Sequence, residues 1–151
     1  ETGLPSHLLE LEITEGLLII DPEGAATVLA GLRAMGIRTA LDDFGTGYSS
    51  LAYLKTFPLD RIKIDRAFVR GLPDDRNDQA ISRAVVALGH SLNMEVLAEG
   101  VETPEQGEFL TAAGCQLFQG NFYGEPMSAD HLMAQIRCGA LSLGEGAGSP
   151  G

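Results

Sequence analysis

The feature that most constrains the fold is a regular alternation of short apolar runs with longer amphipathic segments. Short apolar runs are typical of strands buried in a parallel sheet, and the segments between them are typical of covering helices. Five such strand–helix units can be counted along the 151 residues. This predicts an α/β fold. A complete barrel of eight such units needs about 250 residues, which is more than this chain has.

Local signals place the boundaries of these units. Gly36 and Gly114 each follow an expected helix, where glycine often ends one, and Thr103 with Pro104 marks a helix start. The expected strands are 8–14, 37–41, 61–64, 94–98 and 117–119, and the expected helices are 22–35, 49–56, 79–92, 104–113 and 129–137. Residues 1–140 therefore form one domain in this interpretation, and 141–151, rich in glycine and serine, form a flexible tail.

Composition narrows the class of protein and its partners. Hydrophobic residues make up 44% of the chain, enough for an ordinary core. The net charge of −11 argues against DNA or an anionic membrane as the main partner. We find neither an apolar run long enough to span a bilayer nor a leader, so we expect a cytoplasmic location. Cys115 and Cys138 lack the spacing of a zinc site, which favours reduced cysteines.

Charged residues recur inside or directly after the expected strands. Glu12, Lys63 and Glu99 stand among aliphatic or small neighbours near the carboxyl ends of three strands. Period-two alternation sends Glu12 and Lys63 to the face opposite their isoleucine neighbours. If helices cover the aliphatic face, these charged groups converge inside the barrel at its carboxyl-terminal mouth, where barrels of this kind build active sites.

Asp42 and Asp43 add two adjacent carboxylates where the second expected strand enters a loop. Carboxylates from neighbouring strands suit hard divalent cations, and two such ions can support a phosphoryl transfer. Each charged residue alone has a plainer interpretation as a solvated rim residue or an ion-pair partner, but five together favour a site. Asp43-Phe44-Gly45 matches a protein-kinase triplet without the other kinase motifs, so we discard that interpretation.

Taken together, several motifs resemble the bacterial EAL domain in order and spacing. They are Leu11-Glu12-Ile13-Thr14-Glu15, Asp42-Asp43-Phe44-Gly45-Thr46-Gly47, Lys63-Ile64-Asp65, Ala98-Glu99-Gly100-Val101-Glu102-Thr103 and Gln119-Gly120. The resemblance implies a TIM-type (β/α)8 barrel, of which this chain carries about five carboxyl-terminal units. It also implies hydrolysis of cyclic di-GMP to linear pGpG with two Mg²⁺ or Mn²⁺ ions.

The resemblance further implies roles for the matching residues. Glu12 resembles a ligand of the first metal ion, Asp42 the carboxylate that bridges both ions, and Asp43 a ligand of the second. Glu99 resembles the residue that binds the second ion or orients the attacking water, and the sequence leaves both roles open. Lys63 resembles the cation beside the water and the phosphate.

Three further polar residues take supporting roles in this comparison. Gln119 resembles a polar residue of the catalytic cluster. Glu15 is expected to anchor the loop 43–50, although a carboxylate that favours a helix start explains it about as well. Glu102 is expected to support the site from outside the metal ligands.

The chain departs from the family pattern because the Glu-Ala-Leu signature and an upstream asparagine ligand are absent. We weigh three explanations: part of a longer protein, which we favour; a fragment that pairs with a second copy; and a degenerate domain that binds nucleotide or protein without hydrolysis. We expect the chain alone to be weakly active or inactive. The family also leads us to expect a homodimer, sensory or GGDEF domains in the full-length protein, and possible attachment of that protein to a membrane.

Overall fold

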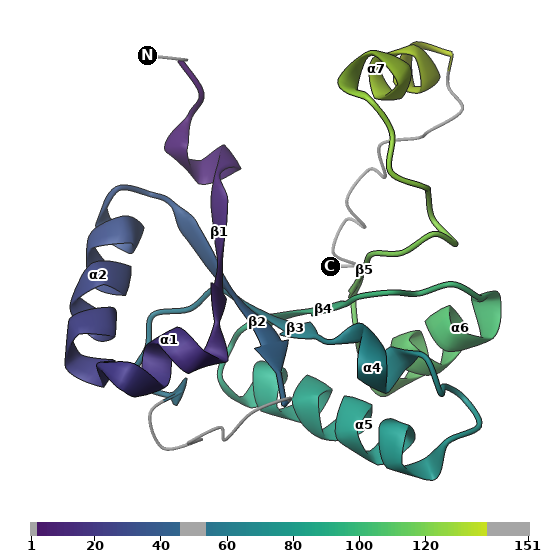
Figure 1. The fold of residues 1–151 in the computed structure, drawn as a ribbon, viewed down its shortest axis with the longest axis horizontal. Helices are drawn as coiled ribbons and strands as arrows, with labels where there is room; N and C mark the ends of the chain where they lie inside the picture. Colours follow the sequence, from purple (N-terminus) through teal and green to yellow (C-terminus); the bar gives the residue numbers. More distant parts are fainter. Residues whose placement is uncertain (1–2, 46–53, 139–151) are drawn as a thin grey trace, which may run out of the picture.

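The computed structural model describes residues 3–45 and 54–138. Its centre is one parallel sheet in which each strand pairs with the next along the chain, in the order β1-β2-β3-β4-β5 (Figure 1). The strands are β1 (Glu10–Thr14), β2 (Arg38–Phe44), β3 (Arg61–Ile64), β4 (Glu95–Ala98) and β5 (Leu117–Phe118). This sequential parallel order confirms the predicted α/β class and the five strands.

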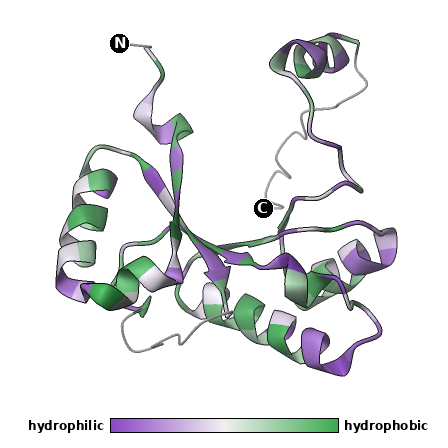
Figure 2. Cartoon of the chain, in the orientation of Figure 1, coloured by the Kyte–Doolittle hydropathy of each residue, from purple (hydrophilic) through white to green (hydrophobic). Residues whose placement is uncertain are grey.

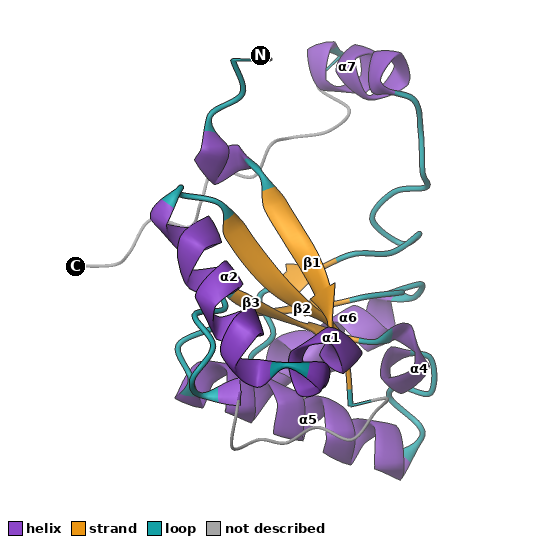
Figure 3. Cartoon of the chain, turned by 60° about the vertical axis from the view of Figure 1, so that its left-hand side comes forward, coloured by secondary structure: helices purple, strands orange, loops and turns teal. Residues whose placement is uncertain are grey.

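Helices connect the strands (Figure 3). They are α1 (Glu15–Ile20), α2 (Pro22–Ala34), α4 (Arg66–Val69), α5 (Arg76–Ser91), α6 (Pro104–Ala113) and α7 (Ala129–Arg137), with a 3₁₀ turn η1 at Ser6–Leu8. The four longer ones match expected helices. Most of the expected helix 49–56, and the whole expected tail 141–151, lie outside the described residues. No described helix is long and apolar enough to cross a membrane.

The boundary signals of α6 act as the sequence predicts. The Thr103 side chain accepts a hydrogen bond from the Gln106 backbone N–H at 3.4 Å, and the Gln106 side chain accepts one from the Thr103 backbone N–H at 3.1 Å. This reciprocal pair satisfies two donors at the start of the helix. Gly114 ends α6 with φ of +98°, a left-handed conformation that glycine adopts without a steric penalty.

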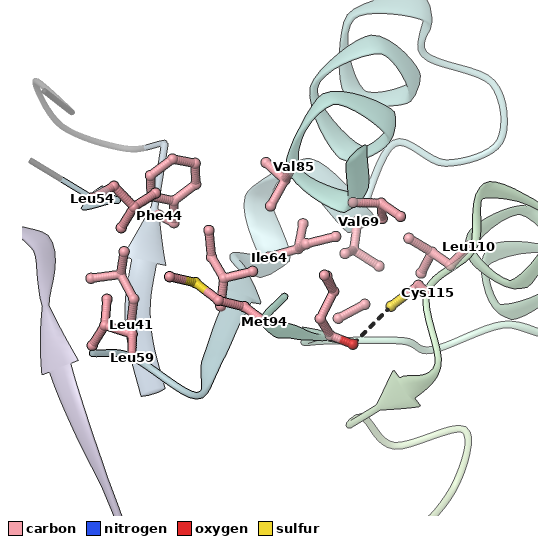
Figure 4. Packing of buried hydrophobic residues seen from close by; sticks show 14 of the residues in the cluster. Leu41, Phe44, Leu54, Leu59, Ile64, Val69, Val85, Met94, Leu110 and Cys115 are labelled. Carbon is pink, nitrogen blue, oxygen red and sulfur yellow. Dashed lines mark hydrogen bonds between the residues drawn. The ribbon is translucent and has the colours of Figure 1, made fainter. Parts of the chain in front are cut away.

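The hydrophobic core lies between the sheet and the helices that cover one of its faces (Figure 4). Ile62, Ile64 and Val96 are at most 2% exposed. Helix α5 approaches so closely that a Cβ added at Gly89 would lie 2.3 Å from Val96 Cγ2. The Cys115 thiol donates a hydrogen bond to the Val96 carbonyl at 3.4 Å. The aliphatic face therefore takes the helices, as the alternation predicted.

Helix α7 stands apart from the sheet on its other side (Figure 1). Leu132 and Met133 are 42% and 47% exposed, and apolar and polar residues mix along the helix (Figure 2). The sheet is thus open along its inner face and at both edges in the part of the chain that the structure describes. This is the arrangement expected for a portion of a barrel.

Candidate metal and catalytic site

Two layers of charge lie on the inner face of the sheet. Strands β1 to β4 each begin with a charged residue, and these four form the layer nearest the amino ends of the strands: Glu10, Arg38, Arg61 and Glu95. The second layer lies toward the carboxyl ends: Glu12, Asp42, Lys63 and Glu99. Residues two apart on a strand share a face, so Glu10 with Glu12, and Arg61 with Lys63, belong to successive layers of the same face.

The second layer is built around the Lys63 ammonium. Its Nζ lies 2.7 Å from Glu12 Oε1, 2.6 Å from Glu99 Oε1 and 3.1 Å from Asp42 Oδ1. The lysine side chain is only 4% exposed. Strands β1 and β2 and the residue after β4 thus bring three carboxylates, distant in sequence, to one buried cation on β3.

The electrostatics of this cluster keep Lys63 charged. Burial alone would lower its pKa, but the contacts with Glu12, Glu99 and Asp42 outweigh burial and raise the pKa above the ordinary 10.5. One positive charge faces three negative ones, so the cluster keeps an excess of negative charge. Asp42 Oδ1 is buried and accepts no well-aligned hydrogen bond, although the ammonium is 3.1 Å away.

Asp43 lies beside this cluster rather than in it. The charge of Asp42, partial desolvation and the charge of Asp65 raise the pKa of Asp43. Its φ is +55°, which is uncommon for residues other than glycine but more accessible to Asp and Asn. The expectation that both aspartates stand at the entrance to a loop needs correction, because β2 runs on through Phe44. A register irregularity between Leu41 and Phe44 accommodates them.

Glu15 is the first residue of α1, directly after β1. It is 7% exposed, and neither of its carboxylate oxygens has a hydrogen-bond partner among the described residues. Residues 46–53 of the loop that it is expected to anchor lie outside the described chain. Its role as a loop anchor therefore stays a prediction, with the helix-start interpretation beside it.

Gln119 and Glu102 flank the end of β4. The Gln119 N–H donates to the Ala98 carbonyl at 2.8 Å, and its carbonyl accepts from the Val101 N–H at 3.0 Å. These bonds hold its backbone beside Glu99.

Glu102 lines a cavity of about 460 Å³ with Arg66, Ala67, Arg70 and Gly100. The two arginines of this cavity were not among the site residues predicted from the sequence.

The first layer is an ion-pair network that the sequence analysis missed. Arg61 lies 2.5 Å from Glu10 and 2.7 Å from Glu95, and Arg38 pairs with the same two carboxylates. Only 16% of the Arg61 side chain is exposed. A signal was present, because a charged residue opens four consecutive strands. The network ties β1 to β4 together at the end opposite the Lys63 cluster.

The second layer supplies the carboxylate oxygens that a divalent cation requires, but these oxygens are not arranged around a common metal position. Carboxylate oxygens are the preferred ligands of hard divalent cations, and the buried Asp42 Oδ1 accepts no well-aligned hydrogen bond, although it is ion-paired with Lys63. Within residues 3–45 and 54–138, no group of three or more His, Cys, Asp or Glu side chains is arranged to hold a metal ion. The Lys63 ammonium instead contacts one oxygen of each of the three carboxylates. Glu12, Asp42 and Glu99 fit the metal by their chemistry.

Comparisons with known proteins identify the family. Residues 1–126 match the family described as the EAL domain. The bifunctional diguanylate cyclase/cyclic di-GMP phosphodiesterase MucR of Pseudomonas aeruginosa is 50% identical over 132 residues, which are 87% of this chain and 19% of that protein. The cyclic di-GMP phosphodiesterase PdeR of Escherichia coli is 43% identical over 80% of this chain and 18% of its own length. The chain thus spans about a fifth of these relatives.

Solved structures give the same result. The complex of the MucR phosphodiesterase with c-di-GMP superposes with a TM-score of 0.82 at 49% identity, over 85% of this chain and 52% of that one. The manganese and cy-diGMP complex of Klebsiella pneumoniae BlrP1 superposes with a TM-score of 0.76 at 40% identity, over 82% of this chain and 32% of that one. With its motifs, its parallel TIM-type sheet and these matches, the chain belongs to the EAL domain family.

Proposed function

We propose that this chain is part of a metal-dependent phosphodiesterase that hydrolyses cyclic di-GMP to linear pGpG. The observation that carries the proposal is the buried Lys63 ammonium with the carboxylates of Glu12, Asp42 and Glu99 around it. Relatives named as cyclic di-GMP phosphodiesterases, and a relative solved with manganese and the cyclic dinucleotide, support the same chemistry.

Each residue of the cluster has a task in this proposal. Glu12 and Asp42 would hold the first of two Mg²⁺ or Mn²⁺ ions, and Asp42 and Asp43 the second. When bound, such a pair lowers the pKa of an attacking water and stabilises the attacking and leaving oxygens. Glu99 would bind the second ion or orient the water through the oxygen that now contacts Lys63.

Lys63 and Gln119 would act on the substrate side of the site. A lysine held charged at neutral pH offsets the negative charge that develops on the phosphate in the transition state. Gln119, whose backbone is fixed beside the end of β4, can hydrogen-bond the water or the phosphate. Glu15 and Glu102 would support the loop 43–50 and the mouth of the site.

The 151-residue chain alone should be weak or inactive, because it carries only part of the barrel. The test incubates this chain, and a version extended upstream to include the Glu-Ala-Leu segment, with Mn²⁺ and cyclic di-GMP and follows pGpG. We expect turnover by the extended chain and little by the short one. Turnover by neither would contradict the proposal.

The alternative is a non-catalytic module that binds cyclic di-GMP or a protein. It has one observation in its favour, since the Lys63 ammonium contacts all three carboxylates and balances part of their charge. Equilibrium dialysis with cyclic di-GMP separates the two, because a module binds nucleotide without forming pGpG. We also propose a homodimer, sensory or GGDEF domains in the full-length protein, and a cytoplasmic site of action.

A further inference from the structure

The Lys63 cluster has a consequence for metal binding that goes beyond its catalytic roles. Its ammonium contacts three carboxylates at 2.6 to 3.1 Å, which are the oxygens that a divalent cation would need. A cation at that position and the ammonium cannot both keep these contacts. Two positive groups a few ångströms apart also repel each other.

We infer that Lys63 is an exchangeable internal counter-ion, which holds Glu12, Asp42 and Glu99 together before metal binds and withdraws from at least one of them when the ion enters. This inference rests on the proposed function. As such a counter-ion, Lys63 stabilises the metal-free protein and weakens the protein's affinity for the first metal ion. A residue that only organises the metal ligands would have the opposite effect on affinity.

The charges around the cluster favour replacement of the Lys63 ammonium by a divalent ion over binding of the ion beside an unmoved ammonium. The cluster has three carboxylates for one ammonium, and Asp43 and Asp65 add further negative charge nearby. Asp42 Oδ1 receives no well-aligned hydrogen bond in the present arrangement. The excess negative charge therefore attracts a divalent ion, while the ammonium occupies the position between its ligands.

The first measurement uses the charge-removing variant Lys63→Met, which keeps the length of the side chain. The fraction of Mn²⁺ bound to the 151-residue chain is followed by electron paramagnetic resonance, and the melting temperature is recorded with and without Mn²⁺. We expect the metal-free variant to melt below the unmodified chain. Removal of a unit charge about 5 Å from a divalent ion should tighten Mn²⁺ binding on the order of tenfold.

Arg61→Gln is the matched control. Arg61 is on the same strand, two residues before Lys63, and is also a partly buried ion-paired cation, but in the first layer. Arg61→Gln should lower the melting temperature and change the Mn²⁺ affinity much less than Lys63→Met does, because Arg61 lies further from the carboxylates of the second layer and is paired with Glu10 and Glu95. Lys63→Arg keeps the charge and should not tighten binding.

The second measurement needs no variant. The chain has two lysines, Lys55 and Lys63, and Lys55 is exposed. In a protein with ¹⁵N-labelled lysine, the buried ion-paired Nζ of Lys63 should give a slowly exchanging ammonium signal. Saturating Mg²⁺ should shift this signal and speed its exchange, with Lys55 as the reference.

The outcomes separate the two proposals. Equal or weaker Mn²⁺ binding by Lys63→Met, or a Lys63 signal that bound Mg²⁺ does not change, overturns the exchange and leaves the phosphodiesterase proposal standing. No Mn²⁺ binding by these chains, and none by the upstream-extended protein in the same measurement, contradicts the metal site itself, and the exchange falls with it.

Discussion

Gly120→Ala tests how closely the segment after β5 packs against the segment after β4. A Cβ at Gly120 would lie 2.1 Å from the Val101 carbonyl oxygen and 2.4 Å from the Val101 backbone nitrogen. Both contacts are with backbone, which cannot rotate away as a side chain can. The chain must therefore separate Gly120 from Val101.

The cost can be worked from these contacts. Forcing a methyl group into a packed position costs about 1–3 kcal/mol, and the rigid neighbour favours the upper half of this range. The same Val101 groups make hydrogen bonds with the Gln119 carbonyl at 3.0 Å and the Phe122 N–H at 3.1 Å. Loss of one adds about 1 kcal/mol, so we expect a loss of about 3 kcal/mol in the free energy of unfolding.

Urea unfolding followed by circular dichroism measures this loss. With a slope of about 1–3 kcal/mol per molar urea, the midpoint should fall by about 1–3 M. Gly124→Ala is the control, because a Cβ there meets no atom within 4 Å, and its midpoint should not move. If Gly120→Ala unfolds at the same urea concentration as Gly124→Ala, the close approach between the two segments is wrong.

Three further variants test the charges of the site. Asp42→Asn in the upstream-extended chain should abolish pGpG formation, because a bridging carboxylate loses its charge and one oxygen donor; near-normal turnover would reject the bridging role. Asp43→Asn should raise the urea midpoint of the metal-free protein at pH 7, since the raised pKa of Asp43 means that its ionised form opposes folding and that stability falls as the pH rises through that pKa; a lower midpoint would contradict this. Burial alone would raise the pKa of Glu95, but its contacts with Arg61 and Arg38 outweigh burial and lower this pKa. The ionised Glu95 therefore stabilises the folded protein above pH 4.5, and this stabilisation is lost as the pH falls through the lowered pKa. Because the side chain is 45% exposed, Glu95→Gln should cost under about 1 kcal/mol at neutral pH and flatten the acid limb of the stability curve; an unchanged acid limb would refute it.

Apolar periodicity and end signals were enough to predict most of the fold. Strand β3 and helix α7 have the predicted bounds, because proline, charge or a capping serine marks their ends. Helices α1 and α4 were missed because they are a few residues long. Such short helices follow from packing at the end of a strand rather than from a periodic pattern.

The candidate site was predicted in part by strand alternation and in part by family resemblance. Alternation places Glu12 and Lys63 on one face, and the structure brings them to 2.7 Å. It could not show that Lys63 would lie between the carboxylates, because this depends on side-chain packing across three strands. The pairing of the charged residues that open four strands was not predicted either, because the pattern of charges was present in the sequence but the pairing depends on the register of the strands.

Anomalous diffraction from crystals of the upstream-extended protein with Mn²⁺ and cyclic di-GMP would locate the metal ions and the Lys63 side chain together. We expect manganese bound to Asp42 and to Glu12 or Glu99, with the Lys63 ammonium moved from at least one carboxylate and toward a phosphate of the nucleotide. Manganese located only away from Asp42, with Lys63 still in contact with all three carboxylates, would overturn both the metal site and the exchange.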